Sequence, residues 1–83
     1  EVVRGAKMIA IKELTDKDNG RWVRYNGSAG EIEDGRIKSW NKNWVFVVYH
    51  CNGEWHRFQD FTGVATDPEQ LTFLDSRKWE HNG

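Results

Sequence analysis

Residues 31–61 read EIEDGRIKSWNKNWVFVVYHCNGEWHRFQDF, and this stretch decides the fold. Residues 31–40 and 45–49 are two runs of strand-forming residues, separated by the loop Asn41-Lys42-Asn43. Asn52-Gly53 is the usual dipeptide of a type I′ hairpin turn, so it predicts that residues 54–61 run back along 45–51. The stretch therefore predicts three consecutive antiparallel strands.

The Asn-Gly turn also predicts which side chains share a face of this sheet. It pairs Cys51 with Glu54, and a three-residue loop at 41–43 then places Ile37 opposite Val47 and Trp40 opposite Trp44. In this register one face is apolar and forms the predicted core: Ile37, Val45, Val47, Tyr49 and Phe58. A two-residue loop would exchange the two faces of the first strand.

The opposite face alternates cations and indoles, and it is the predicted contact surface. Its members are Arg36, Lys38, Trp40, Trp44, Trp55 and Arg57. Such a surface suits a protein partner, or single-stranded nucleic acid whose bases stack on the indoles while cations hold the phosphates. The competing interpretation is structural: Trp40 and Trp44 form a cross-strand pair, and the cations keep the sheet soluble.

The flanking residues extend the β pattern in both directions. Residues 15–20 form a polar turn, 21–25 a strand and 26–30 a glycine-containing loop. Thr66-Asp67-Pro68-Glu69 has the spacing of a capping box with Thr66 as N-cap, so it predicts one helical turn before a last strand at 71–74. We expect an N-terminal extension over 1–11, one domain over 12–74 and a tail over 75–83.

Four stretches of the chain resemble small uncharacterised proteins encoded by phages and prophages, and more loosely the Tudor and KOW barrels. They are Leu14-Thr15-x-x-Asp18-x-Gly20-x-Trp22-Val23-x-Tyr25, Gly35-Arg36-Ile37-Lys38-Ser39-Trp40-Asn41, Phe46-Val47-Val48-Tyr49 and Ala65-Thr66-x-Pro68-Glu69-x-Leu71. The resemblance implies an all-β, five-stranded SH3-like barrel with one short helical turn before the last strand, in a phage-like setting. It rests on barrel-forming positions and implies no activity.

Charge and cysteine content narrow the function classes. The 83 residues include 12 basic and 13 acidic side chains, a net charge of -1, which argues against a strong binder of duplex nucleic acid. The single cysteine forms no internal disulfide, so we expect a reducing, cytoplasmic location. The longest apolar run, residues 45–49, is far too short to span a membrane. Because Met8 is the only methionine, residues 1–7 are left out of the functional argument.

Three further kinds of site fit the pattern less well. An aromatic cage for a cation would use walls and a carboxylate drawn from Trp22, Tyr25, Trp44, Phe46, Trp55, Glu54 and Asp60. His50, Cys51 and His56 lack metal-ligand spacing, and the register puts the two histidines on opposite faces, with Cys51 as a partly exposed turn thiol. Glu31, Glu33 and Asp34 read as a solvated charge run. We therefore expect no metal, no cofactor and no enzymatic activity.

The sequence thus predicts a non-enzymatic binding module with an unknown protein partner. Weak binding of single-stranded nucleic acid by the same face is the alternative. The five tryptophans are too many for one core face, so they require a second packed layer, a partner or another copy of the chain, and a homo-oligomer satisfies the same need.

Overall fold

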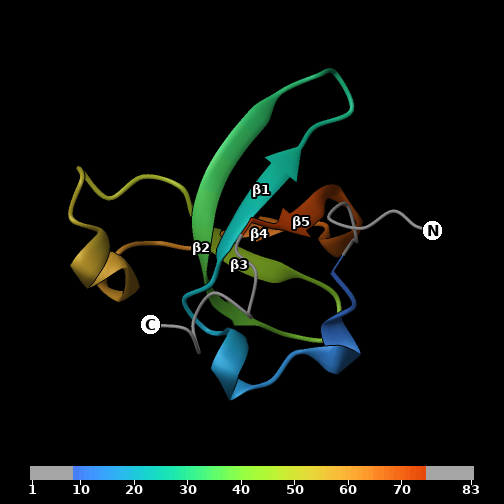
Figure 1. The fold of residues 1–83 in the computed structure, drawn as a ribbon, viewed down its shortest axis with the longest axis horizontal. Coiled ribbons are helices and arrows are strands. Elements are labelled where there is room, and N and C mark those ends of the chain that lie inside the picture. Colours follow the sequence, from blue (N-terminus) through green and yellow to red (C-terminus); the bar gives the residue numbers. More distant parts are fainter. Residues whose placement is uncertain (1–8, 75–83) are drawn as a thin grey trace.

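A curved five-stranded antiparallel sheet forms the centre of the molecule, seen in a computed structural model that describes residues 9–74 (Figure 1). The strands are β1 (Trp22–Asn26), β2 (Ile32–Trp40), β3 (Val45–Val48), β4 (Val64–Thr66) and β5 (Leu71–Phe73). Four 3₁₀ segments accompany them: η1 (Ile11–Glu13), η2 (Asp16–Asp18), η3 (Trp55–Asp60) and η4 (Pro68–Gln70). The fold is mostly β, as predicted, and none of the helices within 9–74 has the length and apolarity needed to cross a membrane.

The sheet has the strand order β4-β3-β2-β1-β5. The predicted strands at 21–25, 31–40 and 45–49 are β1, β2 and β3, so the central part of the sheet follows the sequence pattern. The long strand β2 pairs with β1 on one side and with β3 on the other. β4 and β5 are the terminal strands, and they are joined by the single turn η4.

A β-bulge at Lys38 divides β2 into two halves. Ile37 faces Val47, as predicted, but the next aligned pair is Ser39 with Phe46, so Lys38 is an extra residue. Beyond the bulge Trp40 faces Val45, not Trp44 as the three-residue loop predicted. The bulge reverses the inside–outside alternation, and Trp40 therefore packs against the core.

The second predicted hairpin is wrong. Asn52 and Gly53 do form a turn with positive φ, but the residues after it form η3, and β3 pairs with β4 instead. The spacing of charges matches the observed turn, because Arg57 pairs with Glu54 and with Asp60, each three residues away. That spacing brings side chains together on a helical turn, whereas residues three apart on a strand lie on opposite faces.

The apolar side chains pack in two layers. The first contains Ile9, Val23, Ile37, Val45, Val47 and Leu71, all buried. The second, called here the η3 cluster, contains Val48, Cys51, Trp55, Phe58 and Phe61. Phe58 belongs to this second layer and not to the Ile37 face, because η3 replaces the expected strand. Cys51 is 1% exposed, so its prediction as a partly exposed thiol is wrong for the same reason.

Gly35 allows β2 to pass close to the end of β3. A Cβ atom at this position would lie 2.5 Å from the Val48 carbonyl oxygen and 2.7 Å from Cγ1 of Val47. The side chain of Tyr49 is nearly as close, at 2.9 Å from the same point. Glycine is therefore the residue that fits here, on steric grounds.

The turn before β5 is present as predicted, with its cap one residue later. Asp67, not Thr66, is the N-cap of η4, and its side chain accepts a hydrogen bond from the Glu69 amide at 2.9 Å. Thr66 is instead the last residue of β4 and is buried. The cap shifts because β4 keeps Thr66 paired with Val45 in the sheet.

Candidate functional site

Two of the predicted contact cations bind backbone carbonyl groups of their own chain. Arg36 donates from Nε to the Gly20 carbonyl oxygen at 2.7 Å and from Nη1 to the Trp55 carbonyl oxygen at 3.0 Å. Lys38 donates from Nζ to the Phe61 carbonyl oxygen at 2.7 Å. These bonds attach both ends of η3 to β2, so Arg36 and Lys38 anchor the η3 cluster.

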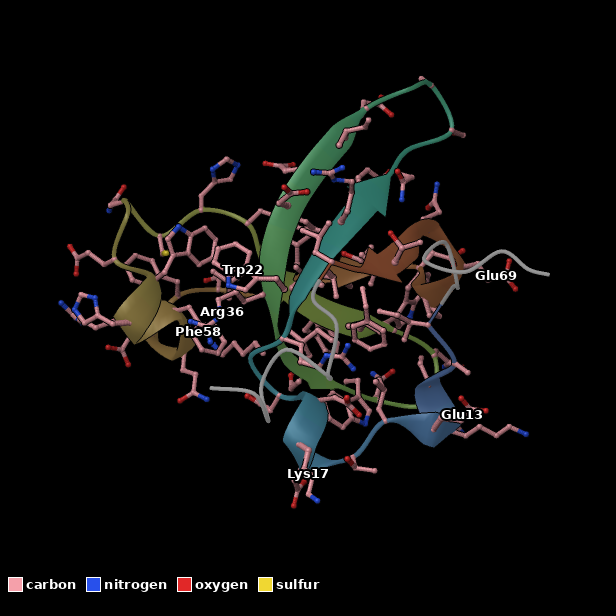
Figure 2. All side chains as sticks on the ribbon, in the orientation of Figure 1. Glu13, Lys17, Trp22, Arg36, Phe58 and Glu69 are labelled. Atoms are coloured by element: carbon pink, nitrogen blue, oxygen red, sulfur yellow. The ribbon has the colours of Figure 1, made fainter. Side chains whose placement is uncertain are left out.

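The guanidinium of Arg36 also lies over aromatic rings. Its carbon is 4.4 Å from the ring centre of Phe58 and 5.7 Å from that of Trp22, within the range of a cation–π contact (Figure 2). Trp22 in turn contacts Trp55, with ring centres 4.6 Å apart. The structure therefore brings Arg36 and Trp55 together, in a region that the chain itself fills.

The three predicted contact tryptophans have different surroundings. Trp40 packs against the first core layer and Trp55 against the η3 cluster. Trp44 lies in the loop before β3 and is 45% exposed. The remaining predicted contact residue, Arg57, is exposed and forms ion pairs with Glu54 and Asp60.

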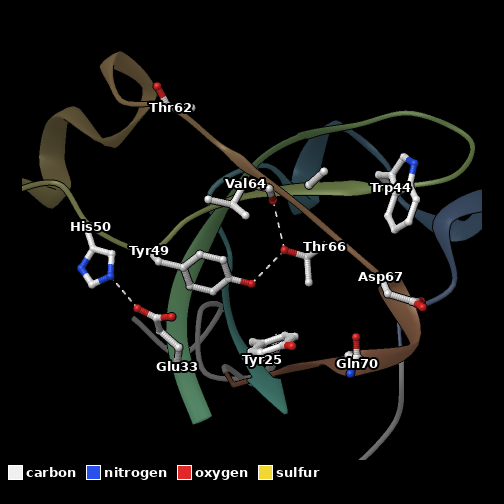
Figure 3. A pocket seen from close by; sticks show the side chains of 11 residues that line it. Tyr25, Glu33, Trp44, Tyr49, His50, Thr62, Val64, Thr66, Asp67 and Gln70 are labelled. Atoms are coloured by element: carbon white, nitrogen blue, oxygen red, sulfur yellow. Dashed lines mark hydrogen bonds and ion pairs between the residues drawn. The ribbon is translucent and has the colours of Figure 1, made fainter. Parts of the chain in front are cut away.

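Trp44 borders an open hollow of about 640 Å³, called here the Tyr49 hollow (Figure 3). This volume lies within the range of about 300–1,000 Å³ that is usual for ligand sites. The lining residues come from the terminal strand β4, from β1 and β2, from the segments flanking β3 and from the turn after β4. They are Tyr25, Glu33, Trp44, Tyr49, His50, Thr62, Val64, Ala65, Thr66, Asp67 and Gln70. Curvature of the sheet brings these elements to one place.

A hydrogen-bonded tyrosine forms the inner part of this hollow. The Thr66 hydroxyl donates to the Val64 carbonyl oxygen at 3.0 Å, so the Tyr49 hydroxyl donates to Thr66 Oγ1, also at 3.0 Å. Burial raises the pKa of the Tyr49 phenol above its ordinary value, so the ring is uncharged near neutral pH. Tyr25 meets the Tyr49 ring edge-on, with ring centres 6.3 Å apart.

Carboxylates supply the formal charge of the hollow. Glu33 Oε2 lies 2.6 Å from Nε2 of His50, whose side chain is 84% exposed. Asp67 lines the hollow at the other end of β4. Val64, which is 51% exposed, adds apolar surface to the same hollow.

A second hollow of about 670 Å³ lies on the other side of Trp44. It is lined by residues 10–12, 42–44 and 67–69. Trp44 and Asp67 line both hollows, so the two are adjacent. Trp44 therefore borders two adjacent hollows rather than belonging to a flat basic stripe.

The sequence missed how Glu33, Tyr49, Val64 and Asp67 gather. Its pattern predicts Tyr49 in the core, against which the ring does pack, and Glu33 in a solvated charge run. The predicted cage contained Tyr25 and Trp44, which do line the Tyr49 hollow, but it also contained Trp22 and Trp55, which contact each other elsewhere. One signal in the sequence could have pointed to this site. Terminal strands usually carry charged side chains that prevent contact with other chains, but the terminal strand β4, Val64-Ala65-Thr66, has none.

The arrangement is suited to binding. Aromatic faces and carboxylates attract cations and apolar groups, and the two hydroxyl groups of Tyr49 and Thr66 are already engaged. Within residues 9–74, no group of three or more histidine, cysteine or acidic side chains is placed to hold a metal ion.

Comparison with known proteins gives no match. No protein-family model matches the chain, and no curated protein or solved structure resembles it significantly.

Proposed function

We propose that this domain is a non-enzymatic binding module that captures a protein partner through the exposed Trp44 and the two hollows beside it. The observation that carries the proposal is the exposure of Trp44 and Val64, at 45% and 51%, on the rim of one hollow. Large apolar side chains gathered at a concave site are typical of protein-contact surfaces, whereas scattered ones need no explanation.

We further propose that the domain is a small SH3-like barrel. The strand order β4-β3-β2-β1-β5 and the single 3₁₀ turn between β4 and β5 support this architecture. The phage-like setting remains a prediction from the resemblance of the sequence.

The surroundings of the cations favour a protein over single-stranded nucleic acid as the partner. Arg36 and Lys38 would have to give up hydrogen bonds to backbone carbonyls before they could hold phosphates. Arg57 is paired with two carboxylates. The basic stripe predicted from the sequence therefore offers few cations ready for a phosphate backbone.

Selection from a random dodecapeptide library on the immobilised domain tests this proposal. We expect enriched peptides whose binding is lost in Trp44→Ala and retained in Ile32→Ala, which removes another exposed apolar side chain (65% exposed) outside both hollows. Both variants should stay folded by circular dichroism. Enrichment of no peptide, or equal binding by Trp44→Ala, would contradict the proposal.

Two measurements separate the competing functions. A labelled oligonucleotide titrated at low and high salt should show no binding, whereas steeply salt-dependent binding would favour nucleic acid. Light scattering of the free domain should give a monomer. A dimer that dissociates in Trp44→Ala would mean that the surface binds a second copy of the chain.

A further inference from the structure

The Tyr49 hollow combines aromatic rings with an excess of negative charge. Glu33 and Asp67 line it, and none of its described lining residues is lysine or arginine. The nearest comparison within the chain is the second hollow, where Lys12 and Lys42 stand with Asp67 and Glu69 and the charges balance. The Tyr49 hollow is therefore the more acidic of the two.

We infer that the Tyr49 hollow binds a basic side chain, lysine or arginine, that projects from the partner protein. This inference rests on the proposed function, since it names the group that the partner places beside Trp44. The geometry that carries it is the convergence of Tyr25, Trp44 and Tyr49 with two carboxylates around one open volume (Figure 3). Ring faces and carboxylates stabilise the same kind of group, a cation.

The aliphatic part of a basic side chain also fits the exposed apolar surface. Val64 and Trp44 lie on the rim, and lysine and arginine carry three or four methylene groups between backbone and charge. The side chain can therefore cover apolar surface on the rim while its charged end approaches Glu33 or Asp67. A small cation without this stem would leave Val64 and Trp44 exposed.

His50 is the neighbour of Glu33, with Nε2 2.6 Å from Oε2 of the carboxylate. Because the His50 side chain is 84% exposed, solvent screens this contact, and the contact reduces the attraction of Glu33 for a further cation only in part. An acidic or phosphorylated partner is disfavoured, because it would face two carboxylates without a neighbouring lysine or arginine in the lining.

Elsewhere in the chain a cation is already combined with an aromatic ring and oxygen acceptors. In the η3 cluster a guanidinium lies 4.4 Å from the ring centre of Phe58 and donates to backbone oxygens. The Tyr49 hollow has comparable rings and oxygen acceptors but no described lysine or arginine among its lining residues. A basic side chain from a partner would complete it in the same way.

Two substitutions remove the charges and preserve the local structure. Glu33→Gln keeps an acceptor for His50, and Asp67→Asn keeps a residue that caps η4 as well as aspartate does. Asp16→Asn, at an exposed position of η2 outside both hollows, is the matched control for loss of one negative charge. The probes are the peptides selected from the library, each with a variant in which its basic residue becomes glutamine.

We expect the selected peptides to share a lysine or arginine at one position. Replacing it with glutamine should weaken binding about fivefold, the scale of one exposed ion pair, and at least one of Glu33→Gln and Asp67→Asn should do the same. Asp16→Asn should bind like the original domain. Amide shifts on titration should centre on residues 64–67 and on the Trp44 indole.

The outcomes distinguish failure of this inference from failure of the proposed function. Peptides that depend on Trp44 but share no basic residue, or that bind Glu33→Gln and Asp67→Asn with unchanged affinity, would overturn the basic side chain and leave the binding module intact. A domain that selects no Trp44-dependent peptide overturns both.

Discussion

The η3 cluster and the Tyr49 hollow are two aromatic regions of one small sheet, and they differ in what completes them. In the first, Arg36 lies over Phe58 and Trp22 and binds two carbonyl groups, so rings, cation and acceptors all come from this chain. In the second, the rings meet carboxylates and open volume. The difference shows that a similar set of groups stabilises the fold when the cation is internal and leaves a site for a ligand when it is not.

Phe58→Ala should disrupt the η3 cluster and have the largest effect on the stability of the domain. Truncating a buried phenylalanine costs about 3–5 kcal/mol, and Phe58 is 7% exposed. A domain of this size has about as much stability in total, so we expect the variant to be largely unfolded by circular dichroism.

Phe58→Leu and Trp44→Ala are the graded and matched variants for that test. Phe58→Leu should lower the free energy of unfolding by less, in urea denaturation that remains two-state. Trp44→Ala should change it by less than about 1 kcal/mol, because an exposed site tolerates substitution. If Trp44→Ala lowered the free energy of unfolding more than Phe58→Leu does, the Tyr49 hollow rather than the η3 cluster would be the region that stabilises the fold.

Arg36→Met tests whether the internal cation anchors η3. It keeps the length of the stem and removes two hydrogen bonds of a charged donor, at a total cost of about 1.5–3 kcal/mol because the guanidinium is only part-buried. We expect lower stability in urea and faster reaction of the buried Cys51 thiol with a thiol reagent under native conditions. Arg57→Met, which removes an exposed cation, is the control, and equal labelling rates in the two variants would show that Arg36 is not an anchor.

Tyr49→Phe tests how much the Tyr49 hydroxyl stabilises the fold, and we expect a smaller effect than that of Arg36→Met. It removes the hydroxyl that donates to Thr66 and should cost about 0.5–1.5 kcal/mol. The pKa of Tyr49 is raised by burial, so its contribution is complete below the ordinary phenol pKa near 10 and is lost as pH rises through the raised value. The free energy of unfolding, measured between pH 8 and about 11, should fall less steeply in the variant. Identical slopes would place Tyr49 in a more solvated setting.

Asp34→Asn should have the smallest effect on stability, and it measures the contribution of an ion pair that lies outside both regions. Asp34 accepts from Arg24 at 2.8 Å on the exposed surface of the β1–β2 hairpin, and this bond lowers the pKa of the carboxyl. The contribution is present above the ordinary aspartate pKa and is lost as pH falls through the lowered one. Thermal unfolding should therefore show a slight loss of stability at pH 7, and the loss should shrink as the pH falls below the ordinary aspartate pKa. A loss as large as that of Arg36→Met would contradict this ranking.

The central sheet was predictable because its strands alternate. The pairing of Ile37 with Val47 follows from that alternation and was correct. The bulge at Lys38 was not predictable, because no residue type marks it, and it moved Trp40 into the core. The Asn-Gly turn was recognised, but the three-residue spacing of Glu54, Arg57 and Asp60 was the better guide to the conformation of residues 55–60.

Of the six predicted contact residues, Trp44 alone lines the candidate site. The exposure of this residue agrees with its assignment to an outward face. The other members of the Tyr49 hollow meet through curvature of the sheet, which brings β4 and the β1–β2 hairpin to the same volume. Sequence spacing gives the neighbours within a hairpin, but it does not give those that meet across an open sheet.

The extra residue in β2 has a consequence for how the length of this chain can change. Arg36 and the bulge residue Lys38 bind carbonyl groups at the two ends of η3, and after the bulge Trp40 packs against the first core layer. Deleting Lys38 would leave Ser39 opposite Phe46 and Trp40 opposite Val45, so the alternation would become regular with Trp40 still in the core, and the bond from Lys38 to the Phe61 carbonyl would be lost. Position 38 is thus the place in β2 where a one-residue deletion is tolerated best, and a deletion scan across β2 would locate it as a local maximum of stability.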